Sequence, residues 1–429
     1  MDRQKSTTAE LANKLLDQVI QSLPVIDIHT HITPDQPSAR DLGEILFYHY
    51  IVTELVTSGV SPELLQQAST TGEKIQLFLS AVKPISNTIT FWCLRRVLEL
   101  YGVGEDLGAE ALWAVEEGIR KSSSDPDWPR RVLREKGKIH KTILTLNFTE
   151  PMPSFDRDLF AGSLRFDDIV TCITPEQLRN LELVCDVKIS DLAGYEQAIG
   201  KRLSALAASG IRVITVGLLP EDDYVPADRQ TAEALFSAFC KGRNLDPSER
   251  AALHSSLLTI LAGFARDLHL PFQLLIGVRR PFPGDVAMPV VRPELVTRYA
   301  SLFHDFSTVR FDLFLCSVAH SQELAVVAKN YPNVSLSGHW WYAFAPPYIR
   351  SMLTERLFLL PAVKLHGFFS DAYNVEWSIG KIALFRRELA WVLADMIISG
   401  YLAESQALEV ARGLLYDNPA RFYGISDAL

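Results

Sequence analysis

Short apolar runs recur along the chain and alternate with longer segments in which apolar residues follow helical spacing. Eight of these runs have the length and the β-branched content of buried strands. They cover residues 25–31, 141–146, 162–165, 211–216, 272–277, 312–316, 334–337 and 362–367. Because helical patterns separate most of them, the alternation predicts a parallel sheet covered by helices.

Helical periodicity accounts for most of the remaining chain. Helices are predicted over residues 8–22, 194–209, 228–267, 292–304, 320–330 and 346–358, with two more within 376–418. Residues 35–135 are almost wholly helical in pattern and are punctuated by Gly59, Pro62, Pro84 and Gly102. Because this block follows the first strand, we predict that it forms a helical insertion or cap.

The number of strand–helix units points to a fold class. Eight units favour an α/β fold of the (β/α)8, TIM-type barrel class, with a large helical insertion after the first strand, over an open doubly wound sheet. No GxGxxG or Walker sequence supports a nucleotide-binding alternative. We predict three parts: residues 1–34 with the N-terminal helix and first strand, residues 35–135 as the insertion, and residues 136–429 as the rest of the barrel with the C-terminal helices.

Composition narrows the class of protein further. The 429 residues are 48% hydrophobic and 22% charged, which is ordinary for a globular protein. A formal net charge of −9 argues against nucleic acid or an anionic membrane as a partner. The sequence has no membrane-spanning apolar stretch and no apolar core of a secretory signal. Five scattered cysteines without CxxC spacing are typical of reduced thiols, so we expect a cytoplasmic protein.

The first predicted strand ends in two histidines. Side chains alternate along a strand, so Asp27, His29 and His31 are expected on one face. Two imidazoles at the end of a strand can chelate one divalent metal ion. The plainer interpretation is a strand that carries polar residues near a sheet edge. We favour the metal site.

Polar residues follow several other predicted strands. They are Arg165 after the third strand, Arg279 and Arg280 after the fifth, His339, Trp340 and Trp341 after the seventh, and Ser370 and Asp371 after the eighth. In a barrel, the carboxyl ends of the strands gather on one face. Barrel closure would bring the last strand beside the first, which makes Asp371 the candidate third ligand to the metal held by His29 and His31.

Several blocks of this sequence together resemble one known family. The blocks are Asp27–His31, His49–Tyr50, Asn87–Val103, Ser163–Asp167, Ile276–Arg280, Gly338–Trp341, Ser370–Asp371, Phe385–Arg387 and Asp417–Arg421. In this order they resemble the uronate (glucuronate) isomerases, a branch of the amidohydrolase superfamily. The resemblance extends from Val25 to about Gly424.

The resemblance implies an activity and a cofactor. The activity is the aldose–ketose isomerisation of hexuronic acids, D-glucuronate to D-fructuronate or D-galacturonate to D-tagaturonate, by proton transfer between C2 and C1. His29, His31 and Asp371 would hold one divalent metal, zinc by preference, with manganese or iron as alternatives. Arg165 would pair with the carboxylate of the sugar acid.

The candidate catalytic groups follow from the chemistry of isomerisation. One group must remove the C2 proton and another must exchange protons with oxygen. We assign Asp371 as the base and Tyr50 as the second group, with its phenol pKa lowered by the metal or by Arg165. The resemblance also places His49 in the pocket. The aromatic run Phe47–Tyr50 is equally well explained by ordinary packing of a helix.

Further substrate contacts are predicted at two other strand ends. Trp340 and Trp341 would stack on the sugar or, on the plainer interpretation, belong to the core. Arg280 would offer a further cation to the sugar acid. The helical insertion also provides surface on which identical subunits could associate.

The chain departs from the family pattern around the pocket. Leu275 stands where the family has a histidine, Tyr373 where it has an arginine, and Thr145–Phe148 lacks the family's acidic pair. These departures indicate a divergent sugar acid as substrate. Two alternatives stay open: a mononuclear, lactonase-like metal-dependent hydrolase of the same superfamily, in which Asp371 activates water, and a non-catalytic sugar-acid binder.

Overall fold

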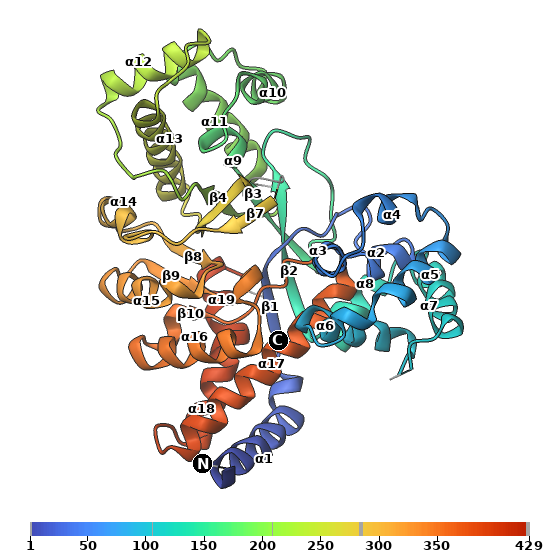
Figure 1. The fold of residues 1–429 in the computed structure, drawn as a ribbon. Helices are drawn as coiled ribbons and strands as arrows, with labels where there is room; N and C mark the ends of the chain where they lie inside the picture. The colour runs from blue at the N-terminus through green and yellow to red at the C-terminus, as the bar shows by residue number, and fades with distance from the viewer. Residues whose placement is uncertain (1, 105, 208, 283–285, 426–429) are drawn as a thin grey trace. The chain divides into compact units, whose positions relative to one another are not determined.

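The computed structural model describes the chain except for residues 1, 105, 208, 283–285 and 426–429 (Figure 1). Its large sheet has the strand order β1-β2-β3-β4-β5-β8-β9-β10. These strands are β1 (Val25–Thr30), β2 (Ile139–Asn147), β3 (Phe160–Arg165), β4 (Ile211–Leu218), β5 (Phe272–Ile276), β8 (Phe311–Leu315), β9 (Val334–Ser337) and β10 (Leu365–His366). Each of the eight predicted runs forms one strand, and the prediction of a TIM-type α/β barrel is confirmed.

The chain divides into two compact units. The first contains residues 1–142 and 369–408, and the second contains residues 143–368 and 409–429. The first unit is therefore built from both ends of the chain. The predicted three-part division at residues 34 and 135 stays a prediction.

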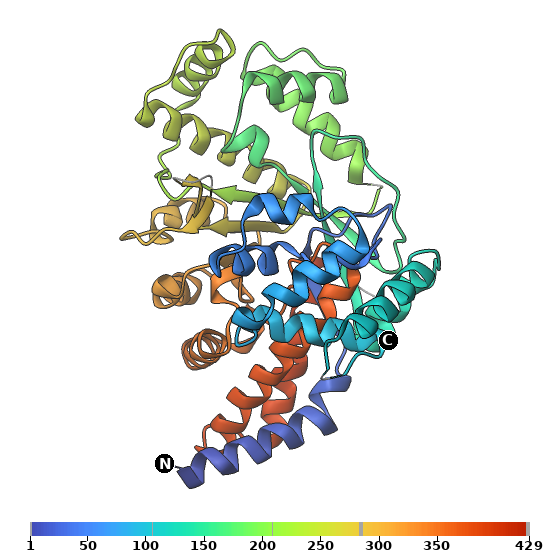
Figure 2. The same ribbon diagram turned by 45° about the vertical axis from the view of Figure 1, so that its right-hand side comes forward.

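The first unit contains β1 and a set of helices. These are α1 (Asp2–Gln18), η1 (Ile20–Ser22), α2 (Leu42–Leu46), α3 (His49–Thr57), α4 (Pro62–Gln67), α5 (Thr71–Ala81), η2 (Lys83–Ile85), α6 (Ile89–Leu98), η3 (Glu99–Tyr101), α7 (Ala109–Ser122), α8 (Trp128–Arg130), η4 (Arg131–Lys136) and α17 (Val375–Ile398). Side chains of Asp41, Ser61, Thr70 and Thr88 cap α2, α4, α5 and α6. Figures 1 and 2 show α1 alongside α17 and the blue and cyan helices gathered together. The prediction of a helical block over residues 35–135 is confirmed.

Helix α17 is the buried centre of the first unit. Most of its 24 residues are buried, which is why its sequence has no polar face. At Gly380 it passes so close to α6 that a Cβ atom there would overlap the carbonyl oxygen of Cys93. Glycine is therefore required at this position by the approach of two backbones.

We expect the Gly380→Ala variant to lose stability. Alanine favours an ordinary helix over glycine by about 0.5–1 kcal/mol, but overpacking of a tight contact costs about 1–3 kcal/mol, so the clash should dominate. Gly263→Ala is the matched control, because nothing beyond the adjoining backbone of its own helix lies within 4 Å of its added Cβ. Thermal denaturation should show a lower midpoint for Gly380→Ala and an equal or higher midpoint for Gly263→Ala. An unchanged Gly380→Ala midpoint would contradict the close packing.

The second unit carries the strands from β3 to β10 and their helices. The helices are α9 (Asp167–Val170), α10 (Pro175–Cys185), α11 (Leu192–Ala207), α12 (Arg229–Cys240), α13 (Pro247–Asp267), η5 (Thr297–Tyr299), α14 (Ala300–Asp305), η6 (Val318–His320), α15 (Ser321–Asn330), η7 (Trp341–Ala343), α16 (Pro346–Leu359), η8 (Ala362–Lys364), η9 (Gly413–Asp417) and α19 (Asn418–Tyr423). Strands β3, β4, β5, β8, β9 and β10 pair in parallel. The division between the units falls within helix α18 (Glu404–Arg412), after Leu408.

Three details of the second unit differ from the prediction. The single helix expected over 228–267 is two helices, because Gly242 adopts a positive φ and Asp246 caps α13. An antiparallel hairpin of β6 (Val278–Phe282) and β7 (Val286–Pro289) was not predicted. Strand β10 is shorter than expected because residues 362–364 form a helical turn. Among the described helices, none is both long and apolar enough to cross a membrane.

Candidate metal centre

The two histidines of the first strand lie where β1 ends. Asp27 and His29 are fully buried within β1, and His31 directly follows the strand. The backbone N–H of His31 donates to the carbonyl oxygen of Ala372 at 2.8 Å, and the N–H of Asp371 donates to that of His29 at 3.1 Å. The segment around Asp371 therefore runs beside the end of β1, and the predicted meeting of Asp371 with the two histidines is confirmed.

His29, His31 and Asp371 form a cluster with the geometry of a metal site. Each offers one ligand atom, and the three atoms lie within 4.8 Å of one another. Nε2 of His31 and Oδ1 of Asp371 are 3.2 Å apart. Two ligands bound at about 2.0–2.1 Å to a tetrahedral ion lie about 3.3 Å apart, so this separation fits a shared ion. Two imidazoles and one carboxylate also leave coordination positions open for substrate.

Asp371 is held in an unusual backbone conformation. Its φ is +52°, in the left-handed region that costs a non-glycine residue about 1–2 kcal/mol. The hydroxyl of Tyr50 donates to its Oδ2 at 3.0 Å, and the hydroxyl of Tyr48 donates to its carbonyl oxygen at 2.9 Å. These contacts offset the backbone strain and fix the direction of the carboxylate.

The Asp371 carboxyl is ionised in this setting. Burial by itself would raise its pKa, but the hydrogen bond and charge of His31, followed by the charges of Lys381 and His29, bring its pKa well below the ordinary value. An ionised carboxylate is the form that binds a divalent metal.

Lys381 of α17 is a site residue that the sequence analysis missed. It is 4% exposed, and its Nζ donates to the hydroxyl of Tyr48 at 3.1 Å and to the carbonyl of Asp371 at 3.4 Å. Its ammonium also lies 4.7 Å from the ring centre of Tyr50. Burial lowers its pKa to about 8. The available signal was a lone lysine within the otherwise apolar stretch Ile379–Phe385.

Burial and a neighbouring carboxylate set the protonation of Tyr50 in the structure. We predicted that a nearby cation would lower the pKa of its phenol. In the structure, burial and the negative charge of Asp371 raise that pKa well above its ordinary value. The phenol of Tyr50 is therefore protonated in this structure.

Asp27 supports the site from inside β1. Its Oδ1 accepts the N–H of Ser370 at 2.8 Å, one residue before the candidate ligand Asp371. Its Oδ2 is buried without a hydrogen-bond partner among the described residues. Burial raises the pKa of this carboxyl to about 7, because a charge there is poorly solvated.

A cavity of about 470 Å³ adjoins the cluster within the first unit. Tyr48, His49 and Tyr373 line it, and these residues also surround the cluster. The ring of Tyr373 stacks on His31 at 5.1 Å, and its edge faces His49 at 5.0 Å. Arg40, another residue that the sequence analysis missed, lines the same cavity and is ion-paired with Glu44. The volume lies in the range of small-molecule sites.

The remaining predicted substrate residues belong to the second unit. Arg165 ends β3, and its Nε donates to Oδ2 of Asp167 at 2.8 Å. Trp340 is buried at 7% exposure, and Trp341 stacks on Tyr342 with the ring centres 5.0 Å apart. Arg280 lies in β6, but its side chain falls outside the described part of the structure. The role of Arg165, Trp340, Trp341 and Arg280 in substrate binding stays a prediction.

Fold and cluster together define a class: a TIM-type barrel with a His–His–Asp site suited to one divalent metal. No family model matches the chain. Its sequence is 20% identical over 452 residues to a uronate isomerase of Thermotoga neapolitana, covering 97% of this chain and 98% of the relative. It is 24% identical over 449 residues to a uronate isomerase of Brucella suis, covering 95% of each.

Solved structures agree with these relatives in fold. The crystal structure of a uronate isomerase from Thermotoga maritima superimposes with a TM-score of 0.88 at 17% identity, covering 96% of this chain and 97% of that one. The structure of a glucuronate isomerase from Caulobacter crescentus gives 0.87 at 20% identity, covering 99% and 95%. The resemblance to the uronate isomerases that the sequence motifs predicted is confirmed.

Proposed function

We propose that this protein is a metal-dependent aldose–ketose isomerase of hexuronic acids. One observation carries the proposal: the carboxylate of Asp371 faces His31 through one oxygen and the Tyr50 hydroxyl through the other. A metal ligand and a proton donor thus meet at one carboxylate. The full-length similarity to uronate isomerases supports isomerisation as the reaction.

The metal would be held by His29, His31 and Asp371, with zinc as the first choice and manganese or iron as alternatives. When bound, it supplies Lewis acidity to the sugar oxygens, which makes the C2 proton more acidic. This assistance matters because a carboxylate is a weak base toward a proton on carbon.

The protein groups then complete two balanced proton transfers. Asp371 takes the proton from C2 and returns it to C1. Tyr50, protonated at the start, gives its proton to the C1 oxygen and recovers one from the C2 hydroxyl. Both groups end in their initial states, as an isomerase requires. His49, which packs against Tyr50 with ring centres 4.1 Å apart, would position that phenol.

The substrate is proposed to be a hexuronate or a close sugar-acid relative. Its carboxylate would pair with Arg165, and Trp340, Trp341 and Arg280 would contribute further contacts. Tyr373 stacks on His31 where the family pattern has an arginine, so the pocket offers an aromatic surface in place of a cation. Substrate preference is therefore expected to differ from that of the family.

The compartment is proposed to be the cytoplasm. All five cysteines are free thiols in the structure, with Cys93, Cys185 and Cys316 buried. Unpaired cysteines suit a reducing environment. The predicted association of identical subunits stays a prediction.

The activity is tested by proton NMR in D2O. Purified, zinc-loaded protein is incubated with D-glucuronate and, separately, with D-galacturonate, and a metal-stripped sample serves as the control. We expect a keto-uronate to form only in the zinc-loaded sample. Deuterium incorporation at C1 would report exchange of the transferred proton with solvent.

Two outcomes would count against the proposal. Equal conversion in the metal-stripped sample would remove the metal from the reaction. No conversion of either sugar by protein that retains about one zinc per chain would favour a divergent sugar acid as substrate or the hydrolase alternative. That alternative is then checked with sugar-acid lactones under the same conditions.

A further inference from the structure

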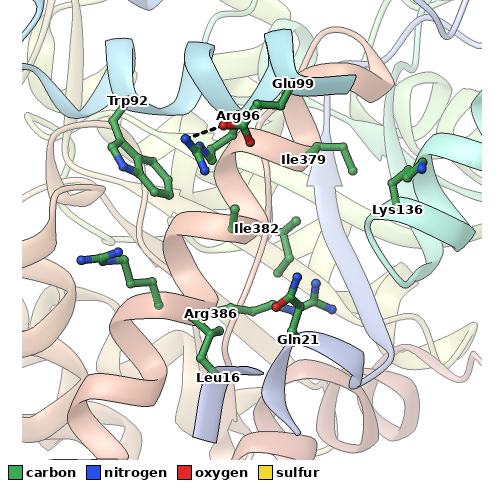
Figure 3. Close-up of a pocket in the computed structure, with 11 residues that line it drawn as sticks. Leu16, Gln21, Trp92, Arg96, Glu99, Lys136, Ile379, Ile382 and Arg386 are labelled. Atoms are coloured by element: carbon green, nitrogen blue, oxygen red, sulfur yellow. Dashed lines mark ion pairs between the residues drawn. The ribbon is translucent and has the colours of Figure 1, made fainter. Parts of the chain in front are cut away.

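A second cavity lies in the first unit, lined by residues with no part in the metal site. It has a volume of about 320 Å³. Figure 3 shows its lining, with Trp92, Arg96 and Glu99 at one end and Arg386 with Gln21 at the other. Ile379 and Ile382 of α17 lie between the two ends.

The lining is strongly cationic. Arg96, Arg386, Arg387 and Lys136 contribute four positive charges, and Glu99 is the carboxylate among the lining residues. The whole protein carries a formal net charge of −9, so the lining of this cavity has the opposite sign of charge to the protein as a whole. Cations around one concave surface raise the local concentration of anions.

Arg386 is a buried arginine in the lining of this cavity. It is 4% exposed, and its Nη2 donates to the carbonyl oxygen of Leu23 at 2.8 Å. Its Nε is buried with no hydrogen-bond partner among the described residues. A buried guanidinium with a missing partner is costly, because the lost hydration is not replaced. An anion in the cavity would balance the charge of this guanidinium.

Arg96 repeats this arrangement at the other end of the cavity. Its Nη2 pairs with Oε1 of Glu99 at 2.5 Å, and its guanidinium carbon lies 5.3 Å from the ring centre of Trp92. Its Nε is also buried and unpartnered within the described structure. The arginine is thus held in place by an aromatic ring and a carboxylate while one donor stays unused.

We propose that this cavity binds a small organic oxyanion, a phosphate ester or a polycarboxylate, whose charged group pairs with Arg96 and Arg386. The fork of donors on each guanidinium suits either oxyanion. The apolar surface of Ile379 and Ile382 suits a carbon skeleton between the charges. The site is independent of the proposed isomerase activity.

The proposal predicts opposite changes in anion affinity for two variants, one at Glu99 and one at Arg387. Glu99 competes with an incoming anion for Arg96, so Glu99→Gln should strengthen anion binding about threefold to tenfold. Arg387→Gln removes a cation from the exposed side of the cavity and should weaken binding by a similar factor. A folding defect would weaken binding in both variants, so it cannot produce this pattern.

Isothermal titration calorimetry of the metal-loaded protein measures these affinities. D-glucose 6-phosphate and citrate are the two anionic probes, and uncharged D-glucose is the negative control. Arg120→Gln is the matched control variant, because it removes an exposed arginine outside the cavity and should leave the affinity unchanged. A bound anion should also raise the thermal midpoint, and the midpoint should keep rising with the logarithm of the free anion concentration above Kd.

The probes also separate the two ligand chemistries. Tighter binding of D-glucose 6-phosphate would assign the site to phosphate esters, and tighter binding of citrate would assign it to polycarboxylates. Three results would overturn the proposal: no binding of either probe at tens of millimolar, equal affinity in all variants, or weaker binding in Glu99→Gln. Arg386→Met should abolish binding if the variant folds, and the exposed variants decide the question if it does not.

Discussion

Replacing His31 with alanine is expected to lower kcat for hexuronate isomerisation by about three orders of magnitude or more. His31 is one of three residues whose ligand atoms lie within 4.8 Å of one another. Its loss leaves two protein ligands, which is too few for a stable zinc site. Bound zinc should therefore fall well below one ion per chain. Metal analysis and steady-state kinetics of the same preparation measure both effects.

The matched control for this variant is His304→Ala. His304 is an exposed histidine of α14, so its removal should change neither the zinc content nor kcat. Circular dichroism of both variants checks that the fold survives. A His31→Ala protein that keeps full zinc and full turnover would exclude His31 as a ligand.

The second large effect is expected from Tyr50→Phe. The substitution keeps the ring and removes the hydroxyl that donates to Oδ2 of Asp371 at 3.0 Å. Loss of a proton-transferring group typically costs about 10²–10⁴-fold in rate, so kcat should fall by that factor. Because none of the three candidate ligands is altered, the zinc content should stay at one ion per chain. NMR assays quenched at fixed times measure kcat, and metal analysis measures the zinc content.

Tyr48→Phe is the comparison that isolates the carboxylate contact. The Tyr48 hydroxyl donates to the backbone carbonyl of Asp371, not to its side chain. Its removal should affect kcat by less than about tenfold, because no transferred proton passes through it. Equal losses in Tyr48→Phe and Tyr50→Phe would indicate that both hydroxyls only hold Asp371 in place.

The fold was predictable because buried parallel strands are continuous apolar runs. Residues 211–216 and 334–337 are short runs of this kind, and both form strands. The hairpin of β6 and β7 was missed because Pro281 and Pro289 argue against strand pairing, although proline is tolerated in short edge strands. The break within 228–267 was missed because a glycine inside a helical pattern is usually tolerated.

The metal cluster was predictable for a different reason. The strand period placed His29 and His31 together, and barrel closure supplied Asp371 from the far end of the chain. Lys381 could not be found this way, because its position depends on how α17 packs against Tyr48 and Tyr50. The burial of Tyr50 could not be found this way either, because the depth of burial is a property of the assembled unit, not of the local sequence. That the metal or Arg165 lowers the pKa of its phenol stays a prediction.

The construction of the first unit from both chain ends has a consequence for biosynthesis. The buried Asp27 carboxylate meets Ser370, 343 positions later, and Asp371 comes next in the chain. During translation, β1 and the helices up to α8 leave the ribosome long before α17 is made. Until then the apolar surfaces that α17 later covers have no partner, and the two histidines lack their carboxylate. Metal capture must therefore come late, and a chain that terminates before Phe369 would expose these surfaces to chaperones and proteases.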